Sequence, residues 1–266
     1  MIEAILALLF GLLIGSFLNV CIYRWPRDLS VVKPRSHCPS CEKTIAWYDN
    51  MPVVSYVLLG ARCRHCKARI SWRYPVVELA TGLLFFYWVY AHGVTALAIK
   101  MCVLSALLVG LIFSDLEERI LPDEMTKGGI VLGLIFAWFV EIQDFSGRAI
   151  LGLMHIPIPE RYSSLEEAAM GAALPAFFLW GGGWLYQKVR HKEGLGFGDV
   201  KLIAMVGAFL GLHSALLTLI LGSIAGSIVG LAYIKWTHQD ASSYELPFGT
   251  FLGVAALAAG LWPGLF

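Results

Sequence analysis

Two aspartates stand where long apolar segments meet charged ones, a position from which a carboxylate could do acid–base chemistry. Asp115 follows "LLVGLIFS", and Asp199 ends the glycine-rich part of "GLGFGDVKL" just before another apolar run. A charged side chain in or beside a membrane-length segment is costly, which makes each a functional candidate. If the two carboxylates meet, they share one proton. Such a pair can activate water for attack on a peptide carbonyl and protonate the carbonyl oxygen.

Simpler accounts exist for each acid. Asp199 could cap a helix, and Asp115 could be an ordinary charge leaving the membrane. A cap does not call for the alternating Gly194, Gly196 and Gly198, which clear one edge of the chain and let another backbone approach the carboxylate. The stretch does not match a nucleotide-binding loop, because an aspartate stands where the dinucleotide fingerprint needs glycine. Asp123, in "LPDE", is expected to cap the helix that follows.

Four of the six cysteines form two Cys-x-x-Cys pairs in the first long polar segment: Cys38, Cys41, Cys63 and Cys66. This spacing predicts a closed four-thiolate zinc site that staples a loop too short for its own core. Two disulfides are the first alternative. They are rare in the reducing cytoplasm, where the distribution of basic residues places this loop. A redox pair is the second, and no thioredoxin-like pattern accompanies it.

The composition is that of an integral membrane protein. Of 266 residues, 58% are hydrophobic and 15% charged, and the mean hydropathy is +0.70. We expect an all-α polytopic protein, with a small zinc-stapled cytoplasmic loop domain between the first and second spans. About eight transmembrane helices are predicted, at residues 4–23, 76–92, 95–113, 128–141, 168–187, 200–213, 214–234 and 248–264.

The basic residues predict the orientation. If the segment from Arg24 to Arg73 is cytoplasmic, 17 of the 20 Lys and Arg residues lie on the inner side. Both termini then face away from the cytoplasm, and Asp115 and Asp199 lie at the inner ends of their spans. Their shared depth is what allows them to meet. The lipid bilayer is an expected partner, and nothing indicates nucleic acid.

Together these motifs resemble the bacterial type IV prepilin peptidases, a family of Gly-x-Gly-Asp intramembrane aspartyl proteases that are also N-methyltransferases. The resemblance covers nearly the whole chain. It rests on the tetracysteine segment, on "SDLEERILPD", on "GLGFGDVKL" and on "LPFGTFLG", in that order.

The resemblance implies that Asp115 and Asp199 are catalytic, preceded by the motif residues Gly196, Phe197 and Gly198. It implies a multi-pass protein of the bacterial inner membrane, of pilus or type II secretion systems. Its substrates would be prepilins or pseudopilins, cut after glycine on the cytoplasmic side. The new N-terminus would then be methylated with S-adenosylmethionine. Weaker candidates for substrate or donor binding are Glu78, Lys201, Pro247 and Gly249.

Three domains follow from this interpretation: a first helix at residues 1–23, a cytoplasmic zinc loop at 24–75 that the resemblance associates with methylation, and a protease core at 76–266. One alternative is a leader peptidase without methylation, whose zinc loop is purely structural. More remote alternatives are a transporter coupled to protons or cations and a scaffold without enzymatic activity. Transporters place their acids near the midplane in repeated halves, whereas these acids cluster at one face.

Overall fold

The computed structural model describes residues 1–142, 144, 146–153, 159–191, 195–237 and 246–261. Within them the secondary structure is helical, with two isolated β-bridges and no strand. The eight long helices coincide with the eight apolar windows: α1 (Ile2–Arg24), α3 (Arg73–His92), α4 (Ala96–Glu118), α5 (Asp123–Phe139), α7 (Ser163–Arg190), α8 (Phe197–Leu210), α9 (Leu212–Thr237) and α10 (Phe248–Leu261). The short helices are η1 (Trp25–Arg27), η2 (Trp47–Asp49), α2 (Val54–Leu58), α6 (Ser146–Leu153) and η3 (Glu160–Tyr162). The all-α prediction is confirmed.

Not all of the eight long helices have the length and hydropathy of a membrane span. Among the described residues, five segments are long and apolar enough to cross a membrane: Ile2–Arg27, Arg73–His92, Ala96–Glu118, Ser163–Arg190 and Leu212–Thr237. Helices α5, α8 and α10 have 17, 14 and 14 residues. Fourteen residues at about 1.5 Å each cover about 21 Å, less than the roughly 30 Å of hydrocarbon. The count of eight spans therefore stays a prediction.

The chain forms two compact units, residues 1–113 and 114–266. The first contains the tetracysteine loop, and the second contains both aspartates singled out in the sequence. The domain boundaries predicted at residues 23 and 75 follow composition and expected function rather than packing, and they stay predictions.

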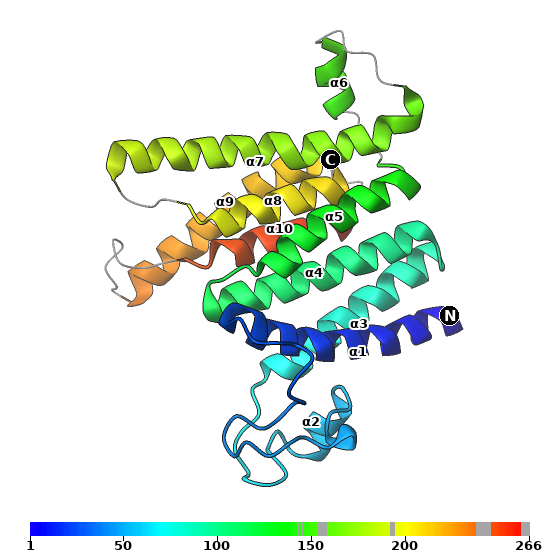
Figure 1. The fold of residues 1–266 in the computed structure, drawn as a ribbon, viewed down its shortest axis with the longest axis vertical. Helices are drawn as coiled ribbons and strands as arrows, with labels where there is room; N and C mark the ends of the chain where they lie inside the picture. Colours follow the sequence, from blue (N-terminus) through cyan, green and yellow to red (C-terminus); the bar gives the residue numbers. More distant parts are fainter. Residues whose placement is uncertain (143, 145, 154–158, 192–194, 238–245, 262–266) are drawn as a thin grey trace. The chain divides into compact units, whose positions relative to one another are not determined.

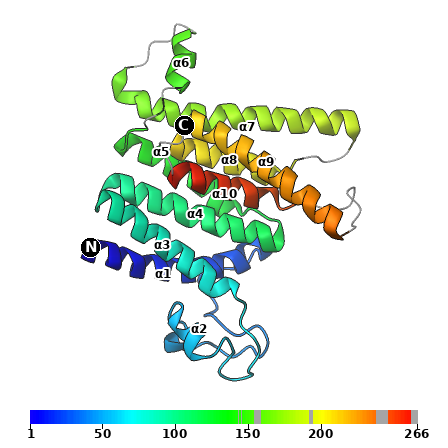
Figure 2. The ribbon, with the colours of Figure 1, turned by 180° about the vertical axis from the view of Figure 1, so that it is seen from behind.

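In the first unit, α1 and α3 lie side by side along their lengths (Figures 1 and 2). Glycines make this approach possible. A Cβ at Gly11 would lie 2.8 Å from the Cα of Gly82, and one at Gly15 would lie 2.6 Å from the Cα of Glu78. The order of these contacts makes the helices antiparallel. Small residues at such an interface let two membrane helices pack by close backbone contact.

In the second unit, α8 is the central helix, in contact with α5, α7, α9 and α10 (Figure 1). Its residues from Leu202 to Phe209 are all buried. A helix that is apolar on every face is stable only when other helices surround it, which is the arrangement seen here. The start of α8 is therefore held by its neighbours, and Asp199 lies in its first turn.

Candidate active site and metal centre

Asp115 lies in the last turn of α4 and is 5% exposed. Its Oδ2 accepts two hydrogen bonds from Thr250, one from the backbone N–H at 2.6 Å and one from the hydroxyl at 2.8 Å. Thr250 belongs to the first turn of α10. Two donors on one carboxylate oxygen fix its orientation and favour its ionised form.

Asp199 lies in the first turn of α8 and is 8% exposed. The N-cap of this helix is Gly196, and no side chain caps it, so the capping account of Asp199 is not what the structure shows. The negative charge of Asp115 acts on Asp199, which places the two carboxylates within electrostatic reach of each other. The structure therefore brings together, inside one unit, the two acids that the sequence singled out.

The glycines of this region make room for side chains of the protein itself. A Cβ at Gly196 would lie 3.1 Å from Oδ2 of Asp199. A Cβ at Gly198 would lie 3.1 Å from the Cβ of Leu121, and one at Gly249 would lie 2.9 Å from a methyl of the same leucine. Gly194 lies outside the described residues. Leu121, buried in the segment between α4 and α5, therefore packs against both glycine motifs, "GFGD" through Gly198 and "LPFG" through Gly249.

Asp123 is the first residue of α5 rather than its cap, because the N-cap is Pro122 and no side chain caps the helix. The capping prediction is wrong. The carboxylate instead pairs with Lys201 of α8 and, at 2.6 Å, with Lys127 of its own helix. These two cations hold the pKa of Asp123 below its usual range. Lys201, a weaker candidate for substrate binding, therefore ties α8 to α5.

The remaining candidates have varied surroundings. Phe197 opens α8 and is exposed, with the Nζ of Lys201 5.2 Å from its ring centre. Pro247 directly precedes α10. Glu78 lies in the other unit, buried in α3, where its Oε2 accepts the Val53 N–H at 2.7 Å. Glu78 holds the first loop to α3.

Sequence reasoning missed Thr250 and Leu121. Leu121 lies within the motif "SDLEERILPD", and Thr250 lies within the motif "LPFGTFLG". Neither residue type suggests chemistry by itself, so only the contacts of their side chains reveal the connection.

The four cysteines of the first loop form one cluster. The Sγ atoms of Cys38, Cys41, Cys63 and Cys66 all lie within 4.8 Å of one another, and those of Cys38 and Cys66 are 3.8 Å apart. A disulfide would need about 2.05 Å. Tetrahedral zinc with Zn–S bonds of about 2.3 Å puts its sulfurs about 3.8 Å apart, so the cluster fits that ion.

The two halves of this cluster have the same backbone. In the first half, the N–H of Cys38 donates to the carbonyl oxygen of Lys43, and the carbonyl oxygen of Cys38 accepts the N–H of Glu42. In the second half, Cys63 makes the same two bonds with Ala68 and Lys67. Each half is closed by an isolated β-bridge. Backbone N–H groups of Cys66 and His65 lower the pKa of the Cys63 thiol, which favours the thiolate that a metal requires.

An ion pair joins the second half to η2. Arg64, between the cysteines of the second pair, donates to both carboxylate oxygens of Asp49, at 2.7 and 2.6 Å. This bidentate contact holds the pKa of Asp49 below its usual range. The loop is therefore closed twice, by the sulfur cluster and by a fork of hydrogen bonds.

The fold and site define a helical membrane protein with a buried carboxylate pair in one unit and a four-cysteine centre in the other. Residues 9–92 match the Bacterial Peptidase A24 N-terminal domain, and residues 102–231 match the Type IV leader peptidase family. The chain belongs to the type IV leader peptidase family. The resemblance drawn from the motifs is confirmed, and the chain is an enzyme of the leader-peptidase class.

Relatives match over most of their length. A Prepilin leader peptidase/N-methyltransferase of Pseudomonas aeruginosa is 35% identical, over 96% of this chain and 89% of the relative. One of Myxococcus xanthus with the same name is 40% identical, over 89% of this chain and 64% of the relative. A Type 4 prepilin-like proteins leader peptide-processing enzyme of Escherichia coli is 34% identical, over 98% and 95%. No solved structure matches the chain.

Proposed function

We propose that Asp115 and Asp199 are the catalytic pair of a peptidase that removes the leader of type IV prepilins or pseudopilins after glycine, with Asp115 as the general base and Asp199 as the general acid. The observation that carries this assignment is the pair of hydrogen bonds from Thr250 to one oxygen of Asp115. These donors favour a charged Asp115. Two neighbouring carboxylates do not both ionise readily, so the proton resides on Asp199.

The reaction then follows from these two protonation states. Asp115 takes a proton from a water molecule, whose oxygen attacks the carbonyl carbon of the scissile peptide bond. Asp199 gives its proton to the carbonyl oxygen. The tetrahedral intermediate collapses, the C–N bond breaks, and the proton held by Asp115 passes to the leaving amine. One hydroxyl of the intermediate returns its proton to Asp199 as the C=O bond re-forms, so both acids regain their starting protonation states. The products are the free leader and a new N-terminus.

The placement of the pair supports this substrate. Asp115 lies in the last turn of the candidate span Ala96–Glu118, and Asp199 lies in the first turn of α8, so both are near helix ends rather than mid-helix. The distribution of Lys and Arg favours the cytoplasmic face of the bacterial inner membrane for these ends and the outer side for both termini. A substrate anchored by an apolar helix presents its leader at such an interface.

We also propose that the tetracysteine loop holds structural zinc. Four sulfurs fill a tetrahedral shell and leave no open position, so the ion would stabilise the loop and take no part in cleavage. Cys38 and Cys41 would supply one half of the shell, and Cys63 and Cys66 the other.

The names of the relatives imply methylation of the new N-terminus with S-adenosylmethionine as donor. This donor carries a sulfonium and an ammonium against one carboxylate. A pocket of about 400 Å³ in the first unit includes Arg24 and Arg35 in its lining and no acidic residue. That lining does not fit a ligand of net positive charge, and no methylation step is assigned to it.

Intact-mass analysis of a prepilin co-expressed with the enzyme tests the assignment. Asp115→Asn and Asp199→Asn should each leave the leader in place, while Asp28→Asn, an exposed acid of the first unit, should not impair processing. The same spectra separate cleavage alone from cleavage with a methyl group, which distinguishes a leader peptidase without methylation. Leader removal by the Asp199→Asn variant would refute the catalytic pair.

A further inference from the structure

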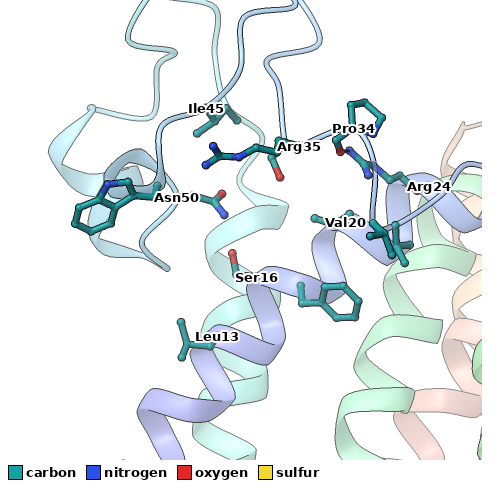
Figure 3. A pocket seen from close by; sticks show the side chains of 13 residues that line it. Leu13, Ser16, Val20, Arg24, Pro34, Arg35, Ile45 and Asn50 are labelled. Atoms are coloured by element: carbon teal, nitrogen blue, oxygen red, sulfur yellow. Dashed lines mark hydrogen bonds between the residues drawn. The ribbon is translucent and has the colours of Figure 1, made fainter.

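The pocket of the first unit lies between the second half of α1 and the loop that follows it (Figure 3). The residues that α1 contributes are spaced by three or four along the helix and share one face: Leu13, Ser16, Phe17, Val20 and Arg24. The opposite wall comes from residues 31–36 and 45–50 of the loop. One side of the pocket is therefore a membrane helix and the other a polar segment.

The apolar end of this face is open. Leu13 is 58% exposed and Phe17 is 49% exposed, although both belong to a candidate membrane span. Side chains of this kind on a spanning helix contact acyl chains of lipid. The pocket thus has hydrocarbon on one side.

The other end is cationic. The buried guanidinium of Arg24 donates to the carbonyl oxygens of Ser30 and Pro34, each at 2.7 Å. Both acceptors are uncharged, so these two hydrogen bonds leave the positive charge in place. Arg35 is exposed at the same end. No Asp or Glu is part of the lining, and Asp49, next to the lining residue Asn50, is held by Arg64.

Polar groups face the space beside this charge. In Figure 3 the polar ends of Arg35, Asn50 and Ser16 are turned toward the same region. Arg35 and the Asn50 amide offer N–H donors. The hydroxyl of Ser16 hydrogen-bonds to Glu78, which leaves the Ser16 oxygen as an acceptor. The pocket therefore offers N–H donors that can bind an anion, next to an oxygen that can accept a hydrogen bond from a hydroxyl group.

We propose that this pocket binds the headgroup of an anionic phospholipid, with Arg35 and Asn50 on the phosphate and the acyl chains along Leu13 and Phe17. Charge complementarity selects an anion, and the open apolar face of α1 selects one that carries hydrocarbon. The positive charge of Arg24, at the same end of the pocket, adds to the attraction for the phosphate. A lipid bound there fastens the loop to α1, a role separate from peptide cleavage.

Lipid binding to the purified protein in an uncharged detergent tests the proposal. Native mass spectrometry compares phosphatidylglycerol with phosphatidylcholine of the same acyl chains. We expect phosphatidylglycerol to be retained preferentially. Arg35→Gln should weaken that lipid about tenfold, the effect of one hydrogen bond to a charged group, and leave phosphatidylcholine unchanged. Val20→Trp, which fills the pocket from α1, should remove the preference with both arginines in place.

Arg69→Gln is the matched control, an exposed arginine of the same loop outside the lining, and it should bind like the wild type. Equal retention of the two lipids by the wild type, or an unchanged Arg35→Gln variant, would overturn the proposal. So would displacement of phosphatidylglycerol by S-adenosylmethionine, or binding of inorganic phosphate alone with the same dependence on Arg35. The wild-type comparison decides the question even if a variant does not fold, and it does not depend on whether Asp115 and Asp199 are catalytic.

Discussion

Thr250→Val isolates the side-chain hydrogen bond that distinguishes the two aspartates. Valine has nearly the volume of threonine, so the change removes the hydroxyl and keeps the packing of the first turn of α10. The hydroxyl lies 2.8 Å from Oδ2 of Asp115. The backbone N–H, at 2.6 Å from the same oxygen, is unaffected by the substitution.

The size of the effect follows from this geometry. A hydrogen bond to a charged acceptor is worth about 1.5–3 kcal/mol, and Asp115 is too buried for water to replace the lost donor easily. If Asp115 acts as the charged base, loss of this donor shifts the shared proton toward Asp115 by the same free energy, and the enzyme is less often in the protonation state that can react. The rate of cleavage should fall by about 10- to 100-fold. The loss is partial because one donor remains, whereas Asp115→Asn should abolish cleavage.

The assay is cleavage of a purified prepilin by the detergent-solubilised enzyme, followed as loss of the leader at several substrate concentrations. The fall should appear in kcat, with little change in KM, because the hydroxyl contacts the base and not the substrate. Thr250→Ser, which keeps the hydroxyl, should retain nearly full activity. Thr81→Val is the matched control, since its buried hydroxyl donates at 2.8 Å to Val77 of its own helix, far in sequence from either acid.

The reasoning fails if Thr250→Val cleaves at the wild-type rate. It also fails if the serine variant is as slow as the valine variant, since the loss would then come from altered packing. A comparable fall in Thr81→Val would show that any lost buried hydroxyl slows this enzyme.

Three further changes have outcomes set by distances in the structure. Gly249→Ala would put a methyl 3.1 Å from the carboxyl carbon of Asp115, so cleavage should drop at least about tenfold in the same assay, since displaced catalytic groups lose rate steeply. Gly207→Ala would drive a Cβ into the carbonyl group of Gly171, and overpacking should cost about 1–3 kcal/mol of stability, measured by thermal unfolding. Cys38→Ser should release the zinc, measured as metal per protein, while leader cleavage continues.

Matched variants check the expectations for stability and for metal content. Gly181→Ala has open space around the new methyl, so it should unfold like the wild type. Ser40→Ala, exposed between two cysteines, should keep its metal. Unchanged stability of Gly207→Ala would contradict the close packing of α7 on α8, and a wild type without zinc would contradict the four-thiolate centre.

The length and hydropathy of the apolar runs made the helices predictable, whereas their exact boundaries depend on local backbone geometry. Each apolar window became a helix because a helix satisfies the backbone hydrogen bonds of an apolar segment internally, even where the segment contains glycines or, in α7, Pro175. The boundary between α8 and α9 falls at Gly211, whose φ of +90° ends the first helix within an apolar run. Hydropathy alone placed this boundary only to within a few residues. The length of α8, too short for a full span, depends on that turn.

The candidate site was predictable where residue type carries the chemistry and not where contact does. The cysteine pairs predicted a sulfur cluster, and the four sulfur atoms lie together. The two aspartate motifs predicted an acidic pair, and the charge of Asp115 acts on Asp199. Thr250 acts on an acid 135 residues away, a pairing that no local pattern encodes. The proline before Asp123 suggested a cap, but the carboxylate forms an ion pair with Lys201 of α8 and does not cap α5.

The glycines of the two motifs divide into those that build the site and the one that opens it. Gly198 and Gly249 both face Leu121, so the starts of α8 and α10 approach the same side chain between α4 and α5. That contact brings the first turn of α8 and the donors of Thr250 to the end of α4, where Asp115 lies. Gly196 is different, because it is exposed and any Cβ there would touch the Asp199 carboxylate. A side chain at Gly196 would stand on the exposed side of Asp199, so the absence of a side chain matters for access at Gly196 and for packing at the other two.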